Sequence, residues 1–255
     1  MKTIILLISI LLSIIPISII GYFFYKRDTI KESKKMLSKL FISGILSGII
    51  VILISVFGIF FFPSLTNIEK INNLLILLFY CYIFVAFLEE TSKFYMIYKI
   101  SYNSKEFDQA YDIILYSVFV GLGFATFENI IYIFGNPNIT TAFLRSLTAV
   151  PAHVCFQTFM GYFLFLNKTK TDNHNIILSI LIPILLHGTY DFLIFTGSNI
   201  MIIFDLIFLI IIIYLSTSII KKLLIIDKNN LQQFCINCGT RINYSFCPNC
   251  GQKKQ

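Results

Sequence analysis

The stretch IMIIFDLIFLIIIIYLSTSII, residues 200–220, decides the fold class of this chain. It holds one charged residue, Asp205, and its length matches the roughly 20 apolar residues that a helix needs to cross a bilayer. Further apolar blocks of similar length precede it. With residues 200–220 they make seven candidate segments: 3–25, 41–65, 74–98, 110–134, 140–166, 175–196 and 200–220. We predict an all-α membrane protein, a polytopic bundle of about seven transmembrane helices.

Composition and charge agree with a membrane location. Of the 255 residues 57% are hydrophobic and only 13% are charged, against about 25% charged in soluble domains. The net charge of +7 need not indicate nucleic acid, because basic loops beside a membrane give the same value. With the N-terminus outside, most of the 20 basic residues fall in inner loops and the tail. We predict a multi-pass protein of the cell membrane with a cytoplasmic C-terminus.

The polar tail carries two C-x-x-C-G pairs, whose thiols are Cys235, Cys238, Cys247 and Cys250. Four thiolates at this spacing are typical of a closed, structural zinc site, and metal binding would supply the folding energy of so short a segment. The alternative is a flexible tail with redox-active thiols. We predict a transmembrane domain over 1–222, a linker over 223–233 and a zinc ribbon over 234–255. The ribbon has too few basic residues for a nucleic-acid surface. It resembles the short zinc ribbons appended to many bacterial membrane proteins, and this resemblance implies a cytoplasmic protein partner.

Ionisable residues inside the predicted segments need a reason, because burying each in lipid costs about 2.5–3.5 kcal/mol on insertion scales. In the third segment Lys93 follows Glu89 and Glu90 by four and three residues, so one helical turn brings the cation against both carboxylates. The alternative is an interfacial cluster where the helix leaves the bilayer. By the predicted boundaries these carboxylates lie nearer the inner end of their helix than Glu128 does, and the difference narrows if the third helix tilts or continues to about Tyr102.

Three later segments carry further polar groups. Glu128 and Asn129 follow a run of small residues that permits close helix contact. His153 follows Pro151 in the next segment, and His187 with Asp191 shares one helix face in the one after. Each could be structural, and Glu128 could lie near the outer interface. For Arg145, Asp112 and Asp205 we expect interfacial positions, because each lies near a segment end.

Grouped together, these side chains fit attack of water on a carbonyl. A Glu can act as general base toward water, and a His can donate to the oxyanion. Alternatively Glu, His and Asp side chains could hold a metal that lowers the pKa of its bound water to about 7. The H-E-x-x-H pattern of familiar zinc proteases is absent from the sequence.

Four motifs in order resemble those of the PrsW-type intramembrane proteases, which are similar to CAAX prenyl endopeptidases. They are E-E-x-x-K at 89–93, F-x-x-x-E-N at 124–129, an isolated His153 before G-Y-F, and H-G-x-Y-D at 187–191. The resemblance covers roughly residues 74–196. It implies hydrolysis of a peptide bond in or beside the membrane, as in cleavage of a membrane-anchored anti-sigma factor.

The resemblance also implies the site residues and their roles. Glu89 or Glu90 would activate water, and His187 with Asp191 would polarise the scissile carbonyl or ligate metal. The whole set is Glu89, Glu90, Lys93, Glu128, Asn129, His153, His187 and Asp191. A catalytic divalent metal, zinc by preference, would bind among Glu90, Glu128, His153, His187 and Asp191.

The rival interpretation is a non-enzymatic membrane protein. It would be a carrier, or a sensory protein, whose buried acids and histidines couple ions or only hold structure. A carrier should show pseudo-symmetric halves, whereas a protease needs a compact pocket with water access. The expected partners of a protease are membrane lipid and a membrane-anchored protein substrate.

Overall fold

The computed structural model describes residues 2–61, 73–170, 173–231 and 249. The described part of the chain is helical, with loops between the helices and no strand. Its elements are α1 (Lys2–Arg27), α2 (Lys34–Phe61), α3 (Leu74–Phe79), the π-helical η3 (Tyr80–Phe87), α4 (Leu88–Ile97), the π-helical η4 (Tyr98–Tyr102), α5 (Asp112–Gly135), α6 (Ile139–Leu147), α7 (Ala149–Lys170), α8 (Asn173–Phe195) and α9 (Asn199–Leu231).

Seven helices in the described ranges are long and apolar enough to cross a membrane, which confirms the predicted all-α membrane fold. Two of them combine several elements: α3, η3, α4 and η4 form the span Leu74–Tyr102, and α6 with α7 forms Ile139–Thr169. The third span therefore does continue to Tyr102. Helix α9 runs on to Leu231, so most of the stretch expected as a linker is helical. The four ribbon cysteines lie outside the described residues, and the zinc ribbon stays a prediction.

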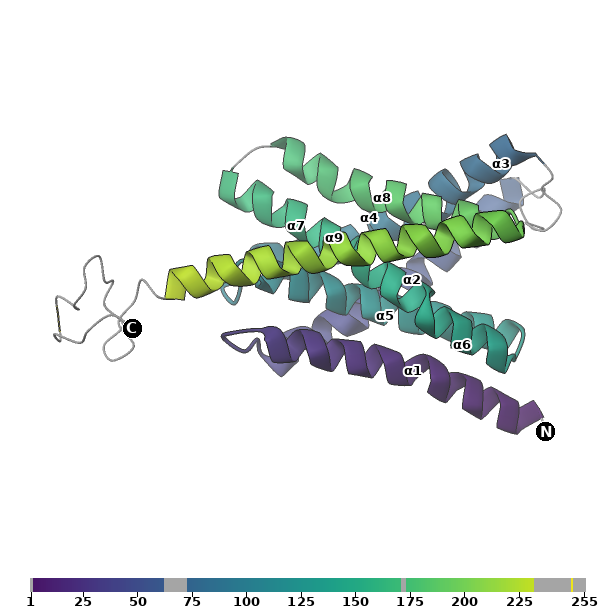
Figure 1. Ribbon diagram of the computed structural model, residues 1–255, viewed down its shortest axis with the longest axis horizontal. Coiled ribbons are helices and arrows are strands. Elements are labelled where there is room, and N and C mark those ends of the chain that lie inside the picture. The colour runs from purple at the N-terminus through teal and green to yellow at the C-terminus, as the bar shows by residue number, and fades with distance from the viewer. Residues whose placement is uncertain (1, 62–72, 171–172, 232–248, 250–255) are drawn as a thin grey trace.

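Helix α5 is the centre of the bundle. Of its most apolar 18-residue window 72% is buried, against 22% for α1 and for α9, which lie at the periphery. It packs against α2, α7 and α1, and Figure 1 shows it enclosed between the other helices. Large apolar side chains remain exposed along α1, α2 and α9, as expected for surfaces in lipid. The polar residues Asp112, Ser117 and Asn129 of α5 are therefore surrounded by protein.

Local breaks in the helices shape the region around the polar motifs. The π-helical η3 ends at Phe87, two residues before Glu89, and such segments occur often at functional sites. Helices α6 and α7 are separated at Thr148, so Pro151 lies in the first turn of α7, where a missing backbone N–H is tolerated. Pro183 lies inside α8, one helical turn before His187. Each break is close to a residue that sequence analysis singled out.

Candidate active site

A buried ion cluster occupies one turn of α4. The Lys93 Nζ lies 2.7 Å from Glu90 Oε1 and 3.2 Å from Glu89 Oε2, and the Lys93 side chain is fully buried. The ammonium also lies 3.8 Å from the centre of the Phe124 ring on α5, a cation–π contact. The expected pairing across one helical turn is therefore present, and it is buried in the bundle interior.

The two adjacent glutamates have different surroundings. Both Glu90 oxygens are engaged: Oε1 with Lys93 and, at 2.8 Å, with His187 Nδ1, and Oε2 with the Gln157 amide, which donates at 2.7 Å. Glu89 contacts Lys93 through Oε2 and, unlike Glu90, lines the cavity described below. Glu90 is thus locked inside the cluster, whereas Glu89 borders open space.

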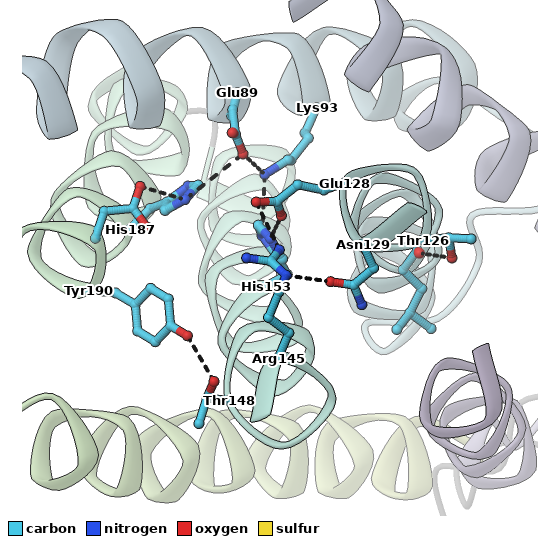
Figure 2. A network of polar contacts seen from close by, with 12 residues as sticks. Glu89, Lys93, Thr126, Glu128, Asn129, Arg145, Thr148, His153, His187 and Tyr190 are labelled. Atoms are coloured by element: carbon cyan, nitrogen blue, oxygen red, sulfur yellow. Dashed lines mark hydrogen bonds and ion pairs between the residues drawn. The ribbon is translucent and has the colours of Figure 1, made fainter. Parts of the chain in front are cut away.

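Glu128 is held between two cationic or donor groups. Its Oε1 lies 2.9 Å from Arg145 Nη2, and its Oε2 lies 2.8 Å from His153 Nε2. Figure 2 shows these side chains converging from α5, α6 and α7. Arg145 also donates from Nε to the Asn129 Oδ1 at 2.8 Å and lies over the Tyr132 ring. The Arg145 guanidinium therefore holds both Glu128 and Asn129 in place.

Arg145 therefore belongs to the polar cluster, a role that its position near a segment end did not predict. Its partner lies 17 residues away on another helix, and only the tertiary structure brings the two charges together. Asp205, also expected at an interface, is buried and lines the same cavity as the site residues. Asp112, at the start of α5, is fully buried and accepts backbone N–H bonds from Asp108 and Gln109. Position near a helix end failed as a guide, because loops and neighbouring helices cover these ends.

His187 links the cluster to α8. Its Nε2 lies 3.4 Å from Asp191 Oδ2 and 3.9 Å from Glu89 Oε2, while Nδ1 faces Glu90. The imidazole stacks on Phe156 at 4.9 Å between ring centres and meets His153 edge-on at 5.3 Å. Aromatic packing on one side and carboxylates on the other set the orientation of this ring.

A cavity of about 650 Å³ lies against the cluster. The acidic, basic and histidine residues that border it include members of all four motifs; they are Glu89, Glu128, His153, His187, Asp191, Arg145 and Asp205. The rest of its wall is mostly apolar and includes Phe84, Phe127 and Ile194. Its volume is in the usual range for a ligand pocket, and few polar groups within an apolar wall are typical of such sites.

Most of the predicted site residues meet in one place. Glu89, Glu90, Lys93, His187 and Asp191 form one connected group, and Glu128, His153, Arg145 and Asn129 form a second. The contact of 3.5 Å between Lys93 Nζ and His153 Nδ1 joins the two groups. Sequence analysis missed Gln157 as a partner of Glu90, Arg145 as a partner of Glu128, and the position of Asp205 in the cavity. Gln157 was visible as a polar residue one turn after His153.

The cluster fits a metal in donor type and spacing. Glu89, Glu90, His153 and His187 each offer a ligand atom, and these atoms lie within 4.8 Å of one another. Carboxylates and imidazoles are common zinc ligands. The cluster has four carboxyl groups and two permanent cations, Lys93 and Arg145, and this excess of acidic groups suits a metal ion. Lys93 already contacts Glu89 and Glu90, so a metal would share these two carboxylates with the ammonium.

Comparison with known proteins identifies the family. The sequence profile of "PrsW family intramembrane metalloprotease" matches residues 32–217. A protein named Protease PrsW from Bacillus subtilis (strain 168) is 32% identical over 186 residues, which are 72% of this chain and 80% of that protein. No solved structure matches the chain.

Two further relatives carry the same name. Protease PrsW from Geobacillus kaustophilus (strain HTA426) is 33% identical over 179 residues, 69% of this chain and 75% of that protein. Protease PrsW from Oceanobacillus iheyensis is 42% identical over 111 residues, 43% of this chain and 51% of that protein. These matches do not favour the carrier or sensory alternative.

Proposed function

This chain belongs to the PrsW family of intramembrane proteases, and we propose that it hydrolyses a peptide bond of a membrane-anchored protein at the cluster described above. The observation that carries the proposal is that residues from all four motifs border one cavity. An anti-sigma-factor-like protein with a single span is the substrate class that we infer. The mostly apolar wall suits side chains taken from a membrane-spanning segment.

Glu89 is our candidate for the group that activates water. It borders the cavity, whereas both oxygens of Glu90 are already engaged. In this role the Glu89 carboxylate takes a proton from water as the oxygen attacks the carbonyl carbon. The same proton then passes to the leaving nitrogen as the C–N bond breaks. Glu90 acts as a positioning residue that orients Lys93 and His187.

His187 and Arg145 are the groups that we assign to charge stabilisation. The Nε2 of His187 lies near Glu89 and Asp191, where a protonated nitrogen would donate to the oxyanion of the tetrahedral intermediate. Arg145 borders the same cavity and is positioned by Glu128. If zinc is present, we expect Glu89, Glu90, His153 and His187 to hold it. It would lower the pKa of a bound water to about 7.

The zinc ribbon and the membrane orientation belong to the same proposal. Cys235, Cys238, Cys247 and Cys250 would bind a structural zinc and form a module that recruits a cytoplasmic protein. An outside N-terminus and a cytoplasmic C-terminus agree with the basic loops. In that orientation the cavity, which is bordered by the start of α9 and the end of α8, opens in the outer half of the bilayer.

The test compares wild type with Glu89→Gln, co-expressed with candidate single-span substrates. We expect a new fragment from wild type, and a loss of cleavage of about 100-fold or more in the variant, because a general base contributes about 10²–10⁴-fold. Glu106→Gln is the matched control, since it makes the same change in an exposed loop. Equal cleavage by wild type and Glu89→Gln would remove Glu89 as the base. A wild type that cleaves none of the substrates would contradict the proposed function.

A further inference from the structure

A second hollow lies beside the later part of α4, about two helical turns from Glu89. This groove, of about 680 Å³, runs between α2 and the α4–η4 part of the third span. Its basic residues are Lys35 and Lys39 on α2 and Lys99 on η4. None of the residues that line it is acidic. We call it the α2/α4 groove.

The α2/α4 groove changes from basic to apolar in the same direction on both of its walls. Along α2, Lys35 and Lys39 are followed at helical spacing by Ile42 and Leu46, which lie farther from the start of the helix. The other wall runs the opposite way in sequence, so Met96 lies about one turn deeper than Lys99. One end of the groove is therefore cationic and the other apolar.

The lysines are available to an external anion. Lys35, Lys39 and Lys99 are exposed, and none of them forms an ion pair with an acid among the described residues. The Lys99 ammonium donates to the Tyr95 hydroxyl at 3.1 Å, which holds it at the mouth of the groove. Ser38 adds a hydroxyl between the two lysines of α2. Three positive charges and a hydroxyl at one mouth suit a phosphate group.

We propose that the α2/α4 groove binds an anionic phospholipid, with the phosphate at the three lysines and an acyl chain along Ile42, Leu46 and Met96. A phospholipid is charged at one end and apolar along the rest, which is the order of residues in the groove. Basic pockets between transmembrane helices on the cytoplasmic side are known to bind such head groups. The proposed orientation places the lysines at that leaflet. The proposal does not depend on the proteolytic activity.

Binding there has a consequence for the third span. Met96 follows Lys93 by three residues, so the wall of the groove continues directly into the turn that carries Glu89, Glu90 and Lys93. A lipid that contacts both α2 and α4 would hold this pair of helices together. We expect phosphatidylglycerol to raise the thermal unfolding temperature of the full-length protein, and phosphatidylcholine to leave it unchanged.

The test uses native mass spectrometry of the full-length protein in neutral detergent with added phosphatidylglycerol or phosphatidylcholine. Wild type should retain phosphatidylglycerol selectively. Lys35→Gln/Lys39→Gln/Lys99→Gln should bind it on the order of 100-fold more weakly, given the usual contribution of a basic residue at an anionic surface. The matched control Lys26→Gln/Lys34→Gln/Lys221→Gln removes the same charge outside the groove and should bind as wild type does.

Two outcomes overturn the proposal. One is equal loss of binding in the control, which would indicate general charge attraction, and the other is equal retention of phosphatidylcholine by wild type. If the triple glutamine variant does not fold, Leu46→Trp is the second variant. Leu46 is half exposed, so the larger ring is tolerated and fills the path of the acyl chain. Undiminished phosphatidylglycerol binding by Leu46→Trp would also contradict the proposal.

Discussion

Asp205 and Asp227 lie on the same helix, α9, and both are buried, but within the described ranges only Asp227 has hydrogen-bond partners. Asp227 accepts backbone N–H bonds from Ala110 at 2.6 Å and Tyr111 at 2.8 Å, just before α5 begins. Asp205 Oδ1 has no partner among the described residues and borders the cavity. A buried acceptor without a donor lowers stability, whereas one that satisfies two backbone groups raises it.

We therefore predict different effects on stability when Asp205 and Asp227 are each replaced by asparagine. Asp205→Asn should leave the unfolding temperature unchanged or raise it, because a neutral amide costs less to bury than an unpaired carboxylate. Asp227→Asn should destabilise the protein by about 1–3 kcal/mol. Each carboxylate oxygen of Asp227 accepts one backbone N–H, whereas an asparagine amide has only one acceptor oxygen, so one N–H would lose its partner. Thermal unfolding in detergent measures both. A similar drop for the two variants would contradict this assignment.

Glu32, in the loop between α1 and α2, gives a prediction for pH. Burial raises the pKa of Glu32 to about 7, and the nearby Glu106 and Asp28 carboxylates add to the rise. When the pKa of an acid is higher in the folded state than in the unfolded state, the folded state binds the proton more tightly. Loss of that proton as pH rises therefore lowers the free energy of unfolding. Stability should therefore fall as pH rises from about 4.5 to about 7, and Glu32→Gln should flatten that decline. An equal slope of unfolding temperature against pH in both proteins would show that Glu32 is not its source.

At the scale of elements, the contact between α2 and α5 depends on missing side chains. A Cβ atom on Gly44 would meet the Val120 carbonyl, and one on Gly123 would meet the Phe41 carbonyl. Two helices that approach this closely need small residues at the crossing. The contact matters for the site, because α5 carries Glu128 and also places Phe124 against Lys93.

Gly44→Ala should therefore destabilise the bundle by about 1–3 kcal/mol, since the added methyl group meets backbone that cannot move aside. Gly135→Ala is the matched control, because nothing lies within 4 Å of a Cβ at the end of α5. Alanine there should be neutral or slightly stabilising, as glycine is a poor helix former. Unfolding temperature and cleavage measured side by side test both. A harmless Gly44→Ala would mean that the two helices separate at little cost.

At the scale of the whole molecule, two different metal sites are expected, one in the tail and one in the bundle. We predict two zinc ions per chain in wild type. Substituting all four tail cysteines (Cys235, Cys238, Cys247 and Cys250) with serine should leave one zinc and an intact cleavage reaction. Adding His153→Ala should then remove the second ion and the activity.

Elemental analysis of the purified variants gives the metal count, and fragment formation gives the activity. The cysteine variant provides the control for the histidine variant, because only the bundle site remains in it. A cysteine variant without zinc that still cleaves would show that the carboxylates and imidazoles act without a metal. Two zinc ions in that variant would contradict the assignment of the tail.

The sequence by itself determined the number of crossings, the helical class and most of the residues that meet at the site. A crossing is a local property: about 20 apolar residues must satisfy their own backbone groups in lipid, so each can be found without its neighbours. The four motifs were likewise visible as ionisable residues where lipid makes them costly.

Only the tertiary structure decided which of Glu89 and Glu90 borders the cavity, that Arg145 pairs with Glu128, and that Asp205 faces the same space. These facts depend on how each helix is rotated about its axis and on which helix lies beside it. That rotation is set by packing between spans, such as the glycine contacts of α2 and α5. The spacing of residues along one span does not predict it.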